Sequence, residues 1–186
     1  MFKALFVYAS FSFLLGFLET NAQTFTSRET EVSFYSHAPL EDIEAKNNKA
    51  ICRWVPAQND IQVGVPIIGF LFEKKLMQEH FHENYMETTK YPVSTFKGKL
   101  IDSTTVQLGT PGKHSVTAKG ELTIHGVARL QEIPCLFEIK EDGSVLVTSN
   151  FEIKLQDFGI KVPSAVGQNI SENVKINIKA LLISKH

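Results

Sequence analysis

A hydrophobic pattern with a period of two lies between residues 116 and 125. Every second position is apolar or small, with polar residues between: Val116, Ala118, Gly120, Leu122 and Ile124. A half-buried strand of an antiparallel sheet needs this alternation, because successive side chains point to opposite faces. His125-Gly126 then predicts a turn, and the apolar run 133–139 predicts the second strand of a hairpin. Small residues on the inner face of a closed sheet admit a large neighbour or leave room for a ligand.

Several other segments show strand patterns separated by residues typical of turns. They are 31–36, 50–55, 60–72, 96–106, 145–155 and 174–183. Pro66 cannot donate to a ladder, so an edge position or a bulge is expected around 66–69. The acidic segment 40–49 is expected to be a short helical turn or loop. Regular strands joined by turns rich in Gly, Pro and Asn indicate a barrel or a sandwich.

Residues 73–87 interrupt this series of strands. Leu76, Met77, Phe81 and Tyr85 fall at helical spacing, and neither Gly nor Pro occurs before Pro92. The spacing predicts a short amphipathic helix, or a pair of turns, over one end of the sheet. Two interpretations remain open for this segment: a lid on the core, or a gate over the mouth of a cavity.

The first 22 residues are typical of a secretory signal peptide. Lys3 precedes an apolar run from Ala4 to Leu18, and small residues stand before an expected cleavage between Ala22 and Gln23. The run is shorter than the roughly 20 residues that span a bilayer. We therefore expect residues 1–22 to be a signal peptide, residues 23–186 to be a single domain, and the protein to be periplasmic or secreted.

Charge and motif content exclude several functions. The formal net charge is −1 and no Lys/Arg cluster occurs, which argues against a nucleic-acid partner. His80 and His82 do not share a helical face, so no metal is expected there. His125 is assigned to a turn rather than to general-base catalysis, and neither a catalytic triad nor a phosphate loop is present. No enzyme activity and no cofactor are expected.

Two cysteines, Cys52 and Cys135, lie in apolar runs typical of strands. Export would permit a disulfide, whereas buried free thiols behave as small hydrophobic groups. The sequence leaves both possibilities open.

Three ordered motifs and a final strand resemble the YceI-like family. The first motif runs from Phe72 through Glu87 to Lys90-Tyr-Pro92 and Phe96-Lys-Gly98; the others are Gly120-Glu-Leu-Thr-Ile-His-Gly-Val127 and Asp157-Phe-Gly-Ile160. The final alternating strand, Val174 to Leu182, also fits. The resemblance implies an exported, lipocalin-like barrel that holds a long isoprenoid-type lipid and does not imply catalysis. Thr30–His37 and the acidic segment Leu40–Glu44 depart from the commoner family pattern. This departure bears on the head group of the lipid and on its portal more than on the fold.

We therefore predict a mainly β protein, a single antiparallel lipocalin-like barrel of about eight strands with a helical segment near 73–87. Its function would be to hold a polyisoprenoid or prenylated quinone-like lipid, with transient contact with membrane lipids. Inward-facing apolar residues are the candidates for the channel: Val63, Val65, Ile67, Phe70, Phe81, Phe96, Ala118, Gly120, Leu122, Ile124, Phe151, Ile153, Ile176 and Ile178. For each residue alone, ordinary core packing is the alternative.

Two other functions fit the same sequence. One is an interaction or assembly module with a filled core, for which an edge near Pro66 would serve as a homodimer contact. The other is an enzyme that acts on prenyl lipids.

Overall fold

The computed structural model describes residues 23–101, 106–162 and 170–185. The strands are β1 (Thr24–His37), β2 (Asp42–Asn47), β3 (Ile51–Val55), β4 (Asp60–Pro66), β5 (Phe70–Phe72), β6 (Val93–Ile101), β7 (Gly112–Ile124), β8 (Val127–Ile139), β9 (Val145–Lys154) and β10 (Asn173–Lys185). The helical elements are the 3₁₀ turns η1 (Pro56–Gln58), η2 (Ile67–Gly69) and η5 (Leu155–Phe158), the α-helix α1 (Lys75–His80) and the π-helical turn η3 (Phe81–Tyr85). The predicted signal peptide, residues 1–22, lies outside the described residues.

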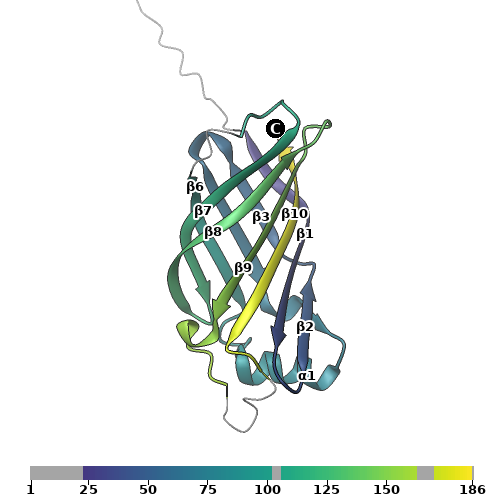
Figure 1. Ribbon diagram of the computed structural model, residues 1–186, viewed down its shortest axis with the longest axis vertical. Coiled ribbons are helices and arrows are strands. Elements are labelled where there is room, and N and C mark those ends of the chain that lie inside the picture. Colours follow the sequence, from purple (N-terminus) through teal and green to yellow (C-terminus); the bar gives the residue numbers. More distant parts are fainter. Residues whose placement is uncertain (1–22, 102–105, 163–169, 186) are drawn as a thin grey trace, which may run out of the picture.

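The strands close into an antiparallel barrel (Figure 1). The order around the wall is β1, β3, β4, β6, β7, β8, β9 and β10, and β10 pairs with β1 to complete the ring. α1, η3 and the β1–β2 hairpin lie at one end of this barrel, which we call the α1 end. The predicted fold, a lipocalin-like antiparallel barrel with a short helical segment, is confirmed.

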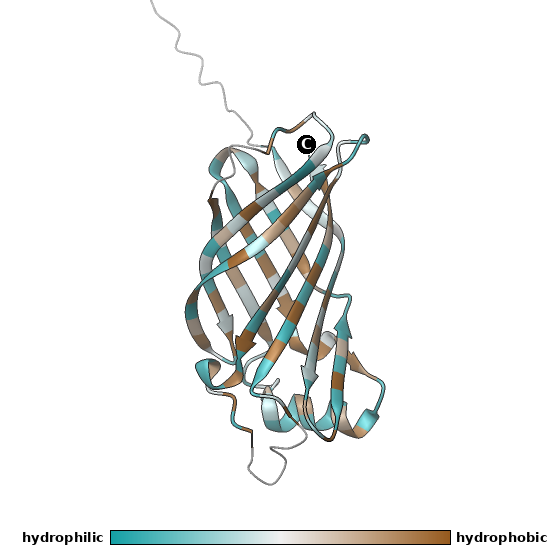
Figure 2. Cartoon of the chain, viewed as in Figure 1, coloured by the Kyte–Doolittle hydropathy of each residue, from teal (hydrophilic) through white to brown (hydrophobic). Residues whose placement is uncertain are grey.

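Alternating polarity along the strands explains why the barrel closes. Figure 2 shows hydrophobic and hydrophilic residues following one another along the strands. On β7, Val116, Ala118, Gly120 and Leu122 are buried, whereas Lys119 and Glu121 are exposed. Burying one face of each strand removes apolar area from water, which stabilises the fold by roughly 25 cal/mol per Å². The pairing of β10 with β1 closes the ring, so neither of these two strands is left as a free edge.

The segment after β1 differs from the expectation. The prediction of a helical turn or loop at 40–49 is wrong, because Asp42–Asn47 form β2 and pair with the second half of β1. Ile43, Ala45 and Asn47 face inward and are buried. The charged residues that suggested a loop occupy the outward positions of this strand.

Two pairs of consecutive strands, β2 with β3 and β4 with β5, are each broken by a short irregular segment. β2 and β3 are separated at residues 48–50, and β4 and β5 are separated by η2. The fully buried side chain of Asn47 joins the interruptions: its Nδ2 donates to the Pro66 carbonyl at 2.7 Å, and its Oδ1 accepts from the Lys49 N–H at 2.8 Å. The Ile67 N–H donates to the Pro92 carbonyl at 2.8 Å. Backbone groups released by the breaks are thus satisfied.

The predicted irregularity around Pro66 is this interruption. Pro66 pairs with Val93 on β6, and its carbonyl accepts from Asn47, so the residue lies inside the barrel wall. A homodimer through this edge stays a prediction. The Pro66 carbonyl already accepts from Asn47, so it is not free to pair with a second chain.

The β7–β8 hairpin has the turn that the sequence predicts. His125 and Gly126 have φ angles of 51° and 73°, the left-handed pair of a type I′ turn. The His125 ring is held by Glu87, with Nε2 and Oε2 2.8 Å apart, and by the Tyr91 ring at 4.5 Å. His125 therefore fastens this turn to the segment that follows η3.

The wall between β8 and β9 is hydrogen-bonded over only part of its length. The ladder runs from Ile139–Val145 to Cys135–Ser149 and stops at Pro134, whose carbonyl accepts from Ser149 Oγ at 2.7 Å. Toward the α1 end, η5 and Ile160 fill the space: Phe158 and Ile160 are buried, and a Cβ on Gly159 would lie 3.7 Å from Val127. We call this part of the wall the β8–β9 seam.

No helix among the described residues is long and apolar enough to cross a membrane.

Candidate functional site

A cavity of about 470 Å³ lies inside the barrel, toward the α1 end. Its wall is mainly aliphatic and aromatic, and all the barrel strands as well as β2, β5, α1, η3 and η5 contribute to it. Cavities that bind small molecules have similar volumes and are likewise mostly apolar with a few polar groups. This space is the candidate site.

The far half of the barrel is filled by side chains. On β3, β7 and β8 respectively, Cys52, Ala118 and Cys135 line the cavity. The next inward residues on these strands, Trp54, Val116 and Phe137, are buried in the core. The Trp54 ring lies 5.1 Å from Phe137, within the range of favourable aromatic pairs. The cavity therefore ends blindly at a packed aromatic layer.

Both cysteines are free thiols at this inner end. Three strands separate β3 from β8 in either direction around the wall, so Cys52 and Cys135 stand on opposite sides. Burial raises the pKa of Cys52 to about 12 and that of Cys135 to about 11. Both groups are therefore uncharged thiols at neutral pH and add to the apolar surface.

Four phenylalanines hold the helical segment against the barrel. The ring of Phe81 on η3 lies 5.4 Å from Phe34, 5.5 Å from Phe70 and 5.0 Å from Phe72. Each such pair contributes roughly 0.5–1.5 kcal/mol beyond the area it buries. All four residues line the cavity, so this Phe81 cluster both anchors η3 and forms part of the wall.

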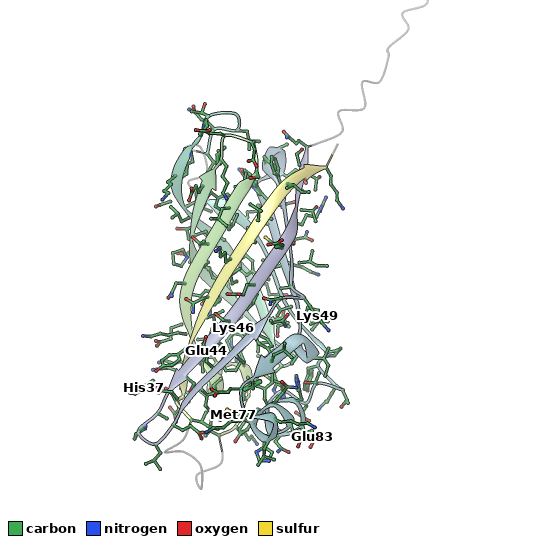
Figure 3. The ribbon with its side chains drawn as sticks, turned by 90° about the vertical axis from the view of Figure 1, so that its right-hand side faces the viewer. His37, Glu44, Lys46, Lys49, Met77 and Glu83 are labelled. Atoms are coloured by element: carbon green, nitrogen blue, oxygen red, sulfur yellow. The ribbon has the colours of Figure 1, made fainter. Side chains whose placement is uncertain are left out.

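The cavity wall reaches the surface at the β1–β2 hairpin and α1, and we call this part its mouth; it carries charged residues beside the apolar Leu76 and Met77 of α1. Glu41 and Lys74 both line the cavity, and their side chains form an ion pair with Oε1 and Nζ 2.5 Å apart. Hydrogen bonding to Glu41 raises the pKa of Lys74. Met77 lies at the same end of the barrel as His37, on the segment that also carries Glu83 (Figure 3).

Uncharged polar groups occur in the same wall. Ser36, Tyr85 and Ser94 line the cavity from β1, η3 and β6. Ser36 Oγ accepts from the Ser171 N–H at 3.1 Å, and burial raises the pKa of the Tyr85 hydroxyl. These hydroxyls can donate or accept hydrogen bonds without bringing a charge into the site.

The structure brings thirteen of the fourteen predicted channel residues together around the cavity. They are Val63, Val65, Ile67, Phe70, Phe81, Phe96, Ala118, Leu122, Ile124, Phe151, Ile153, Ile176 and Ile178. Their contact with a lipid stays a prediction.

Gly120 is the exception. It is buried, but it does not line the cavity, because it packs against the backbone of β6: a Cβ at this position would lie 2.3 Å from the Lys97 carbonyl oxygen. The small residue is therefore needed for close strand approach and leaves no room for a ligand.

Sequence reasoning missed a second set of lining residues. It comprises Val32, Phe34, Ile43, Cys52, Ile61, Phe72, Leu76, Met77, Met86, Ile133, Cys135, Val147, Leu155, Ile160, Ile170 and Val174, together with the polar lining residues. Alternation would have identified Val147 and Val174, because they share a face with residues already named on β9 and β10; Val32 and Phe34 alternate with polar residues on β1, where no candidate was named. Leu155, Ile160, Glu41 and Lys74 carry no such signal, since turns rather than strands place them.

The structure assigns other roles to the candidate polar residues. His82 bonds Thr88 Oγ1 through Nδ1 at 3.2 Å, and burial lowers its pKa. Among the described residues, no group of three or more His, Cys, Asp or Glu could hold a metal ion. His82 therefore belongs to the packing of the segment after α1.

A closed antiparallel barrel with a blind apolar cavity and a helical segment at its mouth is a lipocalin-like architecture. The YceI-like domain model matches residues 15–182, and the chain belongs to this family. The resemblance inferred from the motifs is thereby confirmed. A comparison with curated proteins gave no match.

Several solved structures share the fold. A polyisoprenoid binding domain from Saccharophagus degradans, implicated in plant cell wall breakdown, has a TM-score of 0.75 at 13% identity, covering 88% of this chain and 99% of that one. Burkholderia cenocepacia BcnA has a TM-score of 0.66 at 19% identity, covering 83% and 96%. The Campylobacter jejuni YCEI protein has a TM-score of 0.54 at 19% identity, covering 74% and 81%.

Proposed function

We propose that this protein is an exported, non-catalytic carrier that holds a polyisoprenoid or prenylated quinone-like lipid in its cavity. The observation that carries the proposal is the blind apolar cavity. Side chains fill the far half of the barrel, and the half toward the α1 end encloses this cavity. Transfer of a prenyl chain from water into such a wall is favourable by about 0.8 kcal/mol per CH₂-sized group. The polyisoprenoid-binding domain with the same fold supports this ligand class.

The filled-core alternative is a module that binds proteins and no lipid. The aromatic layer of Phe25, Trp54 and Phe137 is such a filled core, but it occupies only the far half of the barrel. An assembly module has no use for an apolar space of this volume, because unfilled cavities destabilise a fold. The lipid carrier is therefore the better account of this structure.

The proposal includes release to the periplasm or the exterior after cleavage near Ala22, and transient contact with membrane lipids. Residues 1–22 have the order of a signal peptide, which supports export. Sequencing the N-terminus of the native protein tests this part, and a mature chain that retains residues 1–22 would contradict it.

Organic extraction and mass spectrometry test the bound ligand. The full-length gene is expressed with its native leader, the protein is purified without detergent, and the extract is quantified against protein concentration. A prenyl lipid near one per chain is expected. A protein that contains none, and that also fails to bind added geranylgeraniol after delipidation, would overturn the proposal in favour of the module.

A further inference from the structure

The charged residues of the cavity wall are few and are confined to the mouth. Among the described lining residues, the carboxylates and permanent cations are Glu41 and Lys74; His80 also lies in the wall. No arginine is present in this lining.

The cation at the mouth is already compensated. Lys74 Nζ lies 2.5 Å from Glu41 Oε1, and Glu73 adds a second favourable Coulomb interaction with the same ammonium group. The Glu41 side chain is only 27% exposed, so water screens its charge less than that of a fully exposed residue. An anionic ligand group placed against Lys74 would therefore lie close to the Glu41 carboxylate, which already contacts the Lys74 ammonium group, and would be repelled by it.

Recognition of a diphosphate needs more than the mouth offers. Phosphate groups are held by several charge-assisted bonds, from the planar fork of arginine, from unpaired lysines or from clustered backbone N–H groups. The described cavity wall supplies one paired lysine, Lys74, together with His80 and the hydroxyls of Ser36, Tyr85, Ser94, Thr95 and Ser149. Hydroxyl groups suit a neutral oxygen, such as an alcohol or a quinone carbonyl, because they can both donate and accept.

We infer that the cavity selects prenyl lipids with an uncharged, oxygen-bearing head group over prenyl diphosphates, and that Glu41 is the residue that rejects the anion. The inference rests on the proposed function, since it concerns the head group of the same ligand. Specificity of this kind arises from a repulsive element as well as from attractive contacts.

Paired ligands with one tail isolate the head group. Delipidated full-length protein is titrated with geranylgeraniol and with geranylgeranyl diphosphate, at low and at moderate salt. The readout is the ratio of the two dissociation constants. For the wild-type protein we expect the diphosphate to bind roughly tenfold more weakly, the effect of one like charge several ångströms away at a partly exposed site.

Two variants and a matched control test the role of Glu41. Glu41→Gln should reduce this ratio by roughly fivefold and more strongly at low salt, because it removes the repulsion and the direct ion pair of Lys74. Lys74→Gln should increase the ratio. Glu44→Gln removes the same charge from an exposed position paired with Lys46, outside the cavity wall, and should leave the ratio unchanged.

The outcomes separate the two proposals. If neither ligand binds, the proposed function fails. If both ligands bind and the wild-type protein binds the diphosphate as tightly as the alcohol, the proposed carrier function stands and the head-group inference is overturned. Equal ratios for Glu41→Gln and Glu44→Gln would also overturn it, and the wild-type comparison decides the matter if Glu41→Gln does not fold.

Discussion

Gly98 on β6 and Gly120 on β7 face each other so closely that a Cβ on Gly120 would lie 2.4 Å from the Cα of Gly98. The same Cβ would lie 2.3 Å from the carbonyl oxygen of Lys97. Two glycines in register thus let the backbones of neighbouring strands approach more closely than side chains allow. The inward position of Gly120 therefore adds no space for a ligand.

Gly120→Ala should destabilise the barrel. The new methyl group meets backbone atoms, so the strands must separate, and we expect a loss of roughly 2 kcal/mol, or about 4–8 °C in Tm. Thermal unfolding followed by circular dichroism measures it. Gly64→Ala on β4 is the matched control, because no atom lies within 4 Å of its Cβ position. Equal Tm values for the two variants would contradict this account of Gly120.

The same contact rules out Gly120→Phe as a means of blocking the cavity while keeping the fold. Ala118 is the position that suits this purpose, because its side chain lines the cavity.

Ala118→Phe should remove the bound lipid and preserve the fold. The ring would occupy cavity space, so the extracted lipid per chain should fall by roughly tenfold while Tm changes less than in Gly120→Ala. Quantitative mass spectrometry and thermal unfolding are the measurements. Ala128→Phe, at an exposed position on β8, adds the same ring outside the cavity and should retain the lipid. Wild-type lipid content in folded Ala118→Phe would count against the placement of the ligand.

Asn47→Ala should be among the more destabilising single substitutions in the barrel wall. It removes the amide that bonds the Pro66 carbonyl and the Lys49 N–H, and it leaves both backbone groups without this partner in a buried place. The expected loss is about 3 kcal/mol of unfolding free energy in urea titrations.

Asn177→Ala provides the comparison for this variant. Asn177 also bonds through its side chain, to Asn150, but the pair is exposed to water. Its loss should be below about 1 kcal/mol, because water replaces the missing partner. Similar losses at the two asparagines would show that Asn47 does not secure the interrupted strands.

The buried thiols make stability depend on alkaline pH. A thiol of the unfolded chain titrates near 9.0, whereas burial raises the pKa of Cys52 to about 12 in the folded protein. Above pH 9 the unfolded chain therefore loses a proton that the folded chain keeps. The contribution is fully present below pH 9 and declines with rising pH, by up to about 1.4 kcal/mol per pH unit for each thiol.

Cys52→Val isolates this contribution, because lysines and tyrosines titrate alike in both proteins. Urea unfolding between about pH 8 and about pH 11 should show a shallower decline for the variant than for the wild-type protein. Cys135→Val should act in the same direction, since burial raises its pKa to about 11. Identical slopes for all three proteins would contradict the burial of the thiols.

Strand alternation predicted an antiparallel β fold that could be a barrel or a sandwich, and the family resemblance selected the barrel. Alternation also identified many of the residues that line the cavity. It assigns a face to each residue, which is why Val63 and Val65, Ile176 and Ile178 were named correctly as inward-facing. It does not report how closely two strands approach, and this is why Gly120 was misplaced. That spacing depends on the residue opposite, Gly98, which is distant in sequence.

The mouth of the cavity was not predictable for a related reason. Glu41 and Lys74 meet because the β1–β2 hairpin and the start of α1 come together at one end of the barrel, 33 residues apart in sequence. β2 itself was missed because its inward positions are Ile43, Ala45 and Asn47, only one of them a large apolar residue. Local patterns reveal strands that bury bulky side chains and overlook strands that bury small or polar ones.

The β8–β9 seam affects how wide a guest the barrel can hold. Changing the girth of a fully laddered barrel breaks a row of main-chain hydrogen bonds. Here the ladder ends at Pro134, and η5 with Ile160 completes the wall by side-chain packing. The circumference of the barrel at the seam is consequently set by how Leu155, Phe158 and Ile160 pack together. Substitutions in this turn can therefore alter the width of the cavity and leave the strand pairing intact.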